Sequence, residues 1–305
     1  MRKLLICLLA MLTMIMPVAA AQEMAADTTI LAKMMAVEKI IYGSEQTGAL
    51  IERLARMEKD IFGQEQKEAL LTRLDKLYGY TCVTTAAAPS FVTSLNAVEW
   101  TLTHSVSGDA GKARIESVER LMLGNAQTGT LDERLKRLSR LAYGDSHPTV
   151  NQVTVMKDTL VKIKIVTPLD TRKSRPGDIV TFTAAEDVYV DGVLVIARGA
   201  LGTGKVTKVE PAKNFGRDAK LEVTFDAIQA VDNATVDTIL GDKAKEETKS
   251  LAKAAGATVA GLAILGPVGV VGGAFVQGKE ITIPAGSELY IQTKSEMDIY
   301  GIKVK

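Results

Sequence analysis

Apolar residues recur at helical spacing through residues 22–146, in short segments whose remaining positions are polar or charged. Two such stripes are formed by Leu50, Leu54, Met57 and Ile61 and by Leu131, Leu135, Leu138 and Leu141. A period near 3.6 residues is typical of amphipathic helices. Each predicted helix ends at an aromatic residue or a leucine followed by glycine, which suits a left-handed C-cap. We therefore expect short helices joined as hairpins.

The predicted helices belong to an internal repeat. The segment EKIIYG at 38–43 returns as EKDIFG at 58–63 and as ERLMLG at 119–124, and further units end at Tyr78-Gly79 and Tyr143-Gly144. The region divides into 22–80 and 94–144, with 81–93 as a linker. Arg53, Arg134 and their charged neighbours are expected to form solvated faces with ion pairs inside each helix.

Beyond residue 146 the pattern changes from helical spacing to alternation. Apolar alternation predicts strands near 160–165, 179–182, 188–196, 204–209, 220–225 and 234–236. Asp191-Gly192 between two apolar runs is a strong hairpin signal. Many short strands at this spacing predict a small all-β barrel or sandwich over 155–305. The fold class is therefore α+β: helical repeats, then a β domain.

The β domain contains an insertion at 243–278, and residues 254–278 carry no charged side chain. A strand–glycine turn–strand motif at 195–201 is repeated at 282–289, directly after the insertion. Small residues spaced four apart permit close helix contact, and Pro267 predicts a turn between two helical arms. We expect a glycine-zipper hairpin that contacts a membrane or another copy through Gly256, Ala260, Gly261, Pro267, Gly269 and Gly273.

Three environments for this hairpin stay open. In the first the hairpin inserts in a membrane, for example as an oligomer, since its arms are too short to span a bilayer singly. In the second environment the hairpin packs on the barrel or on the helical half and covers apolar surface there. A flexible glycine-rich loop is the least favoured, because its Val, Ile and Leu side chains would be exposed.

The first residues indicate export. Arg2 and Lys3 precede an apolar run that is too short to span a membrane and ends in small residues, so residues 1–21 resemble a cleavable signal peptide. Cys7 is removed with it, which leaves Cys82 as a single thiol and excludes an internal disulfide. The 37 basic and 36 acidic residues nearly balance, so no electrostatic footprint for nucleic acid is present.

No motif predicts catalysis, a cofactor or a metal. Gly199–Lys205 and Gly273–Lys279 have phosphate-loop spacing, but neither is followed by Ser or Thr and both lead into strands. We interpret both as turns, not nucleotide sites. Two isolated histidines and one cysteine form no metal-ligand pattern, and no nucleophile elbow occurs. The carboxylates Glu186 and Asp187 are expected at a turn or strand end.

The order of motifs in the β half resembles a known family. A strand is followed by Arg175-Pro176-Gly177-Asp178, then by Ile196-Ala197-Arg198-Gly199, a glycine-rich apolar insertion, and Ile283-Pro284-Ala285-Gly286. Over residues 155–300 this resembles the C-terminal β-barrel of the TrbI-like scaffold proteins of conjugation and type IV secretion. The resemblance implies the barrel and a membrane role for the insertion. A channel function does not transfer, because this chain has a cleavable signal instead of an inner-membrane helix.

The helical repeats resemble units found in exported bacterial envelope proteins. We therefore expect an exported, non-enzymatic protein of the periplasm or outer membrane. Its helical repeats would contact envelope proteins, and its hairpin would contact membrane or copies of the chain. The alternative is a periplasmic ligand-binding protein or hydrolase with its site in the β domain.

Overall fold

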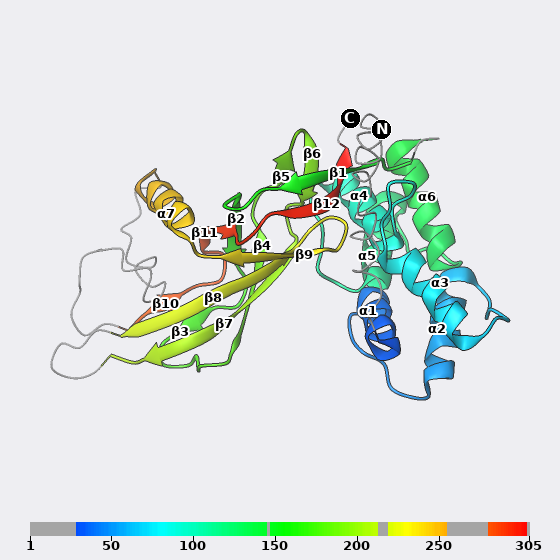
Figure 1. Ribbon diagram of the computed structural model, residues 1–305, viewed down its shortest axis with the longest axis horizontal. Helices are drawn as coiled ribbons and strands as arrows, with labels where there is room; N and C mark the ends of the chain where they lie inside the picture. The colour runs from blue at the N-terminus through cyan, green and yellow to red at the C-terminus, as the bar shows by residue number, and fades with distance from the viewer. Residues whose placement is uncertain (1–28, 145–146, 213–218, 255–279, 304–305) are drawn as a thin grey trace, which may run out of the picture.

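The computed structural model describes residues 29–144, 147–212, 219–254 and 280–303. A helical region is followed by a β region, and the two lie side by side along the longest axis of the molecule (Figure 1). The fold class predicted from the sequence, α+β, is confirmed, and of the two predicted forms of the β domain the structure has a closed barrel. The signal peptide predicted at 1–21 lies outside the described residues.

The helical region consists of two triplets of 13-residue helices. The first triplet is α1 (Ile30–Tyr42), α2 (Leu50–Phe62) and α3 (Leu70–Cys82), and the second is α4 (Phe91–Thr103), α5 (Gly111–Leu123) and α6 (Leu131–Tyr143). The helices begin at residues 30, 50 and 70 and again at 91, 111 and 131, a spacing of 20 residues within each triplet. The unit of repetition is therefore a helix triplet, not the helix pair expected from the sequence.

Glycine ends several of these helices as expected. Gly43, Gly63 and Gly124 adopt φ of 80°, 84° and 83° at the C-caps of α1, α2 and α5, a conformation that side chains with a Cβ rarely adopt. The helix end predicted at Gly79 is wrong, because α3 continues through it to Cys82. Gly79 keeps a helical conformation, and a Cβ there would meet no atom within 4 Å.

Apolar stripes from all six helices meet in one core. Met34, Leu54, Leu74, Leu95 and Leu135 are buried in it together with Phe91, and the partly buried rings of Phe62 and Tyr80 pack against it. Phe62 and Tyr80 pack edge to face with ring centroids 5.0 Å apart. The two triplets therefore share one hydrophobic core and form a single packed body.

The β region contains a closed barrel with the strand order β11-β2-β4-β7-β8-β9. Its strands are β2 (Leu160–Ile165), β4 (Ile179–Ala184), β7 (Leu201–Glu210), β8 (Lys220–Gln229), β9 (Thr235–Ile239) and β11 (Glu288–Thr293). A second sheet, in the order β1-β12-β6-β5, is formed by β1 (Val150–Val155), β5 (Val188–Val190), β6 (Val193–Ile196) and β12 (Met297–Lys303). β3 (Leu169–Asp170) pairs with β10 (Thr282–Ile283).

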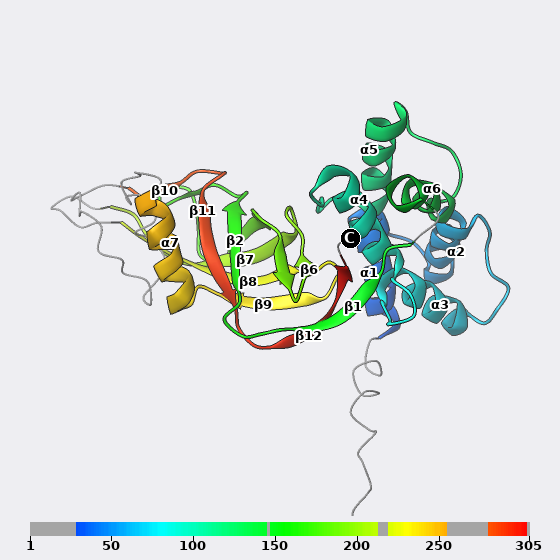
Figure 2. The ribbon, with the colours of Figure 1, turned by 90° about the horizontal axis from the view of Figure 1, so that it is seen from above.

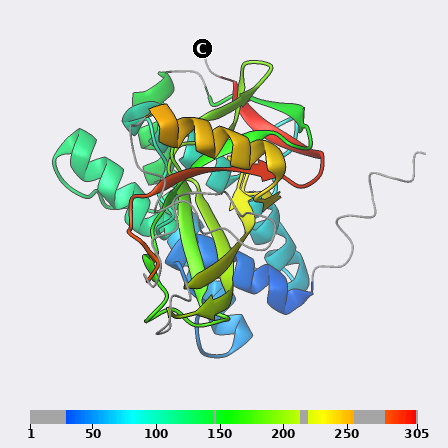
Figure 3. The same cartoon turned by 90° about the vertical axis from the view of Figure 1, so that its left-hand side faces the viewer.

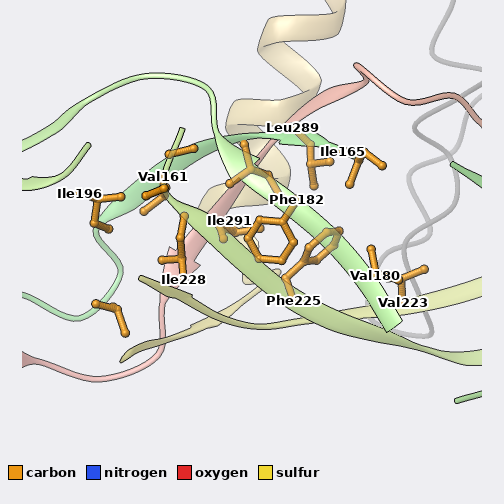
Figure 4. Close-up of a cluster of buried hydrophobic side chains, with 14 of the residues drawn as sticks. Val161, Ile165, Val180, Phe182, Ile196, Val223, Phe225, Ile228, Leu289 and Ile291 are labelled. Atoms are coloured by element: carbon orange, nitrogen blue, oxygen red, sulfur yellow. The ribbon is translucent and has the colours of Figure 1, made fainter. Parts of the chain in front are cut away.

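Alternation along each strand fills the barrel with apolar side chains (Figure 4). Phe182 and Phe225 pack edge to face at its centre, with ring centroids 5.4 Å apart. Gly202 and Gly204 on β7 make room for this packing. A Cβ at Gly202 would lie 2.1 Å from the Phe182 ring, and one at Gly204 would lie 1.9 Å from the carbonyl oxygen of Thr224. The predicted hairpin is present, with Asp191 and Gly192 at φ of 51° and 75° between β5 and β6.

The insertion begins with α7 (Asp242–Ala254), which packs along β11 on the outside of the barrel (Figure 3). The Thr248 hydroxyl accepts a hydrogen bond from the Tyr290 amide at 2.8 Å, and the Gln292 side chain accepts one from the Ala244 amide at 2.9 Å. These bonds fix the first arm of the predicted insertion against the barrel wall.

Candidate functional site

The six residues predicted to contact membrane or another copy, Gly256, Ala260, Gly261, Pro267, Gly269 and Gly273, lie outside the described residues. The second phosphate-loop spacing, at 273–279, lies there too. In the part of the chain that the structure describes, no helix combines the length and apolar character needed to cross a bilayer. Within the described residues, the candidate sites are therefore the helical repeat, its junction with the barrel, and its exposed ends.

A buried ion pair joins each helix to the next within both triplets. A glutamate in the last turns of one helix accepts hydrogen bonds from an arginine 15 residues later on the following helix. The four pairs are Glu38–Arg53, Glu58–Arg73, Glu99–Arg114 and Glu119–Arg134. We call each of them a Glu–Arg staple.

Each staple also holds the loop between its two helices. In the last staple, Arg134 donates from Nε to Glu119 Oε1 at 3.0 Å and from Nη2 to Oε2 at 2.7 Å, and the Gln127 amide donates to the same Oε2 at 2.9 Å. The equivalent loop amides of Gln46, Gln66 and Ser107 donate to the other three glutamates. Glu38, Glu58 and Glu119 thus accept at both carboxylate oxygens, and Glu99 accepts its bonds at Oε2, so each buried carboxylate has donors that compensate its charge.

The charges in a staple reinforce each other. Burial by itself would raise the pKa of Glu119, but hydrogen bonds from Arg134 and the Gln127 amide outweigh it and hold the pKa below its ordinary value. The hydrogen bond to Glu119 likewise raises the pKa of Arg134. Both groups stay charged at neutral pH, so the staple is a permanent ion pair.

The expectation that Arg53 and Arg134 lie on solvated faces with ion pairs inside one helix is wrong. Both side chains are largely buried and bond to the preceding helix. Helical spacing compares residues three or four apart and therefore misses a partner across a loop. The signal that would have revealed it is the constant spacing of 15 residues between glutamate and arginine in four units.

Helix α4 docks the helical region onto the β region. The Asn96 side-chain amide donates to the carbonyl oxygen of Val231 at 2.8 Å, and the Trp100 indole donates to the Asp187 carboxylate at 3.0 Å. Around them Ala97, Trp100, Leu194, Ala197, Val231 and Ile302 form a small apolar cluster. Trp100 also packs edge to face with His104, at 6.0 Å between ring centroids. The interface is therefore both apolar and hydrogen-bonded.

The loop after α4 closes the same junction. The Val106 amide donates to the carbonyl oxygen of Arg198 at 2.8 Å. A Cβ at Gly199 would lie only 2.0 Å from the carbonyl oxygen of Val106, so this turn accepts only glycine. The first phosphate-loop spacing, which begins at Gly199, therefore serves domain docking and leads into β7, in agreement with the interpretation as a turn.

A cleft of about 350 Å³ lies beside this junction, between α1, α4 and the outer faces of β7, β8 and β9. Half of its lining residues are alanine, valine, isoleucine or leucine, and Lys39, Asp109 and Arg114 are the charged ones. The side-chain oxygen Oε1 of Gln229, which lines the cleft, is buried and has no hydrogen-bond partner. Its amide nitrogen donates to the Thr235 hydroxyl at 3.4 Å. The wall of the cleft thus contains one buried acceptor without a partner in the described chain.

Most of the exposed large apolar side chains of the helical region lie near the ends of the helices. One group lies at the N-terminal ends of the first triplet: Ile30, Leu31, Ile51 and Leu71. Another lies at the C-terminal ends of α5 and α6: Leu121, Met122, Leu123 and Leu141. Contiguous exposed apolar side chains on a soluble protein mark interaction surfaces, whereas scattered single ones do not.

The remaining sequence candidates have structural roles. Glu186 bonds to Lys162 at 2.7 Å, and Asp187 accepts from Trp100, the Tyr189 hydroxyl and the Arg198 amide. Glu186 and Asp187 flank the start of β5, as expected. Among the described residues, no three histidine, cysteine or acidic side chains form a group suited to a metal ion.

No protein-family model and no curated protein sequence matches the chain. Among solved structures, ComB10 of the Com type IV secretion system of Helicobacter pylori is similar, with 13% sequence identity and a TM-score of 0.27. The alignment covers 47% of this chain and 88% of that chain. This weak similarity is consistent with the resemblance of the β half to TrbI-like proteins. A TM-score this low carries no argument about function.

Proposed function

We propose that the protein is an exported, non-enzymatic component of the cell envelope that connects partners through its helical repeat and its barrel insertion. The observation that supports this most directly is the pairing of a rigid scaffold with exposed apolar ends. Four Glu–Arg staples and the α4 junction hold the helices and the barrel in one arrangement. A rigid body with apolar helix ends is suited to binding other proteins.

The insertion supplies the second contact in this proposal. Helix α7 packs on the barrel wall, on the side away from the helical region (Figure 2), and residues 255–278 follow it directly in the chain. A membrane-bound or self-associated insertion would then leave the helical repeat projecting from the opposite side. The protein would bridge a membrane or a second copy on one side and an envelope protein on the other.

Cell fractionation tests this function. We compare the full chain with a variant in which a glycine–serine linker of equal length replaces residues 254–278. The full chain is expected in the membrane fraction or in a complex much larger than the monomer, and the variant is expected to move toward the soluble fraction. If both forms are fully soluble and monomeric, membrane docking and self-association through the insertion are both wrong.

A second candidate function is ligand binding in the junction cleft, favoured by the unpartnered Oε1 of Gln229. A peptide end offers N–H donors to this acceptor and charges that match Lys39 and Asp109. Thermal-shift measurements with a panel of dipeptides test it. Stabilisation that is lost in Ala227→Phe, which fills the cleft, would favour a ligand-binding protein. Equal melting temperatures with and without every dipeptide would rule out this ligand class.

A further inference from the structure

The two helix triplets dock on each other in a head-to-tail manner. α1 contacts α5, α2 contacts α6 and α3 contacts α4. The reciprocal pairs, such as α4 with α2, do not form contacts of comparable extent in the described chain. The first triplet thus uses its C-terminal helix ends, which we call its tail, and the second receives them on its N-terminal helix ends, which we call its head.

The same local contact occurs twice in this interface. A Cβ at Gly43, the C-cap of α1, would lie 3.3 Å from Cβ of Ala110, the N-cap of α5. A Cβ at Gly63, the C-cap of α2, would lie 3.0 Å from Cγ2 of Thr130, the N-cap of α6. In both cases the C-terminal end of a helix contacts the N-terminal end of the fourth helix after it in the chain. The docking therefore follows one rule that a further triplet can repeat.

Aromatic residues of α2 and α3 seal the interface. The Tyr80 ring lies between Phe62 and Phe91, with ring centroids 5.0 and 6.1 Å away. Its hydroxyl donates to the Asp132 carboxylate at 2.6 Å. Phe62 and Tyr80 belong to the tail of the first triplet, whereas Phe91 and Asp132 belong to the head of the second.

The second triplet has a corresponding tail. Its α4 end is covered by the β region, through Trp100 and Val106, whereas its α5 and α6 ends are open among the described residues. Because α1 begins at residue 30 and α4 at residue 91, each position of the first triplet corresponds to the position 61 residues later. Leu123 and Leu141 replace Phe62 and Tyr80, and they are 39% and 48% exposed. Beside them Leu121 is 66% exposed, and a Cβ at Gly124 would meet no atom within 4 Å.

The first triplet likewise has an open head. Ile30 takes the place of Phe91 and is 42% exposed, and Leu71 takes the place of Asp132 and is 53% exposed. The polar pair between Tyr80 and Asp132 inside the chain thus corresponds to Leu141 and Leu71 on the two open faces. Both members of the pair have changed from polar to apolar. The open tail and the open head therefore match each other chemically.

We propose that the open α5 and α6 ends of one copy dock on the head of the first triplet of another copy, repeating the contacts that the α2 and α3 ends make inside the chain. This inference rests on the proposed interaction function and names a second copy as one partner. α5 ends and α1 begins on opposite sides of the helical region (Figure 2). One copy can therefore use both faces at once, which produces a ring or a filament rather than a closed two-fold dimer.

The test uses two single variants of the full chain, and sedimentation velocity reports their association. Leu141→Glu blocks the tail and Leu71→Glu blocks the head. Each alone is expected to weaken association at least tenfold relative to the unmodified chain. An equimolar mixture is expected to form a one-to-one dimer and nothing larger, because one open tail and one open head remain. Ile179→Glu, an exposed apolar position on β4, is the matched control and is expected to associate normally.

Folding is checked by circular dichroism, and Leu123→Glu with Ile30→Glu forms a second pair in case either first variant does not fold. A monomeric unmodified chain overturns the inference, and so does a mixture that stays monomeric while the unmodified chain associates. Replacement of residues 254–278 by the linker must leave this association intact. If the purified chain is monomeric but still fractionates with the envelope, self-docking of the repeat is wrong and the proposed function stands.

Discussion

The Glu–Arg staple makes a quantitative prediction for the substitution Arg134→Met. The side chains of Glu119 and Arg134 are 1% and 6% exposed, and two hydrogen bonds join them at 3.0 and 2.7 Å. Methionine keeps the apolar stem of the arginine and removes its charge. The Glu119 carboxylate then stays buried with the Gln127 amide as its remaining donor. Removing one partner of a buried ion pair costs about 3–5 kcal/mol, because the other charge is left uncompensated.

This loss is large against the total stability of a folded domain, about 5–15 kcal/mol. The control is Lys136→Met on the same helix, which removes an exposed ion pair with Asp132. That pair contributes at most about 1 kcal/mol. Urea unfolding followed by far-UV circular dichroism measures both variants. The double variant Glu119→Leu with Arg134→Met removes both charges, and it is expected to regain part of the stability lost in Arg134→Met.

The pH dependence gives an independent check. Because the pKa of Glu119 is lowered in the folded chain, its contribution is fully present above the ordinary carboxyl pKa and is lost as the pH falls through the lowered value. The cost of Arg134→Met is therefore expected to be largest near neutral pH and to shrink toward about pH 4, where carboxyls protonate. A cost equal to that of Lys136→Met, or one that does not vary with pH, would refute the reasoning.

Three further changes follow from the packing. Burial raises the pKa of the Cys82 thiol to about 12, so at pH 8 a disulfide reagent is expected to label the folded chain roughly 100-fold more slowly than the urea-unfolded chain. Gly79→Ala is expected to stabilise α3 by about 0.5–1 kcal/mol in urea unfolding, because alanine favours the helix and has open space there. Gly204→Ala is expected to cost about 3 kcal/mol or more, because its Cβ would collide with the backbone of β8. Asp187→Ala leaves the Trp100 indole without its acceptor, which is expected to cost about 1–3 kcal/mol and to shift its fluorescence to longer wavelength. Equal labelling rates of the folded and unfolded chain would contradict the first prediction. Equal effects of Gly79→Ala and Gly204→Ala on the unfolding free energy would contradict the second, and an unchanged Trp100 emission spectrum would contradict the third.

Local patterns in the sequence predicted the elements well where one periodicity dominates. Leu54, Met57 and Ile61 of the predicted stripe are buried on α2, and the Asp191-Gly192 hairpin is present, because both depend on neighbours a few residues away. The strand β1 was missed. Its pairing with β12 joins residues about 150 positions apart, which no local pattern reports.

The sites were less predictable because they depend on contacts across loops. Arg134 is paired with a residue on the preceding helix, and Leu141 is exposed although it continues the apolar stripe of Leu131, Leu135 and Leu138. A helical period indicates which residues share one face of a helix. It does not indicate whether another element covers that face. Comparison of Leu141 with Tyr80, its counterpart in the first triplet, supplies that information, because the counterpart is covered.

The pairing of β1 with β12 determines how the molecule responds to mechanical load. Val150, where the chain leaves the helical region, lies opposite Ile302, near the end of β12. The two strands are antiparallel, so a pull between the helical region and the end of β12 opens their hydrogen bonds one rung at a time, beginning at Val150. The barrel strands lie beyond this pair and receive the force only after it has separated. Under tension the β1–β12 pair is therefore expected to separate first, while the barrel remains closed.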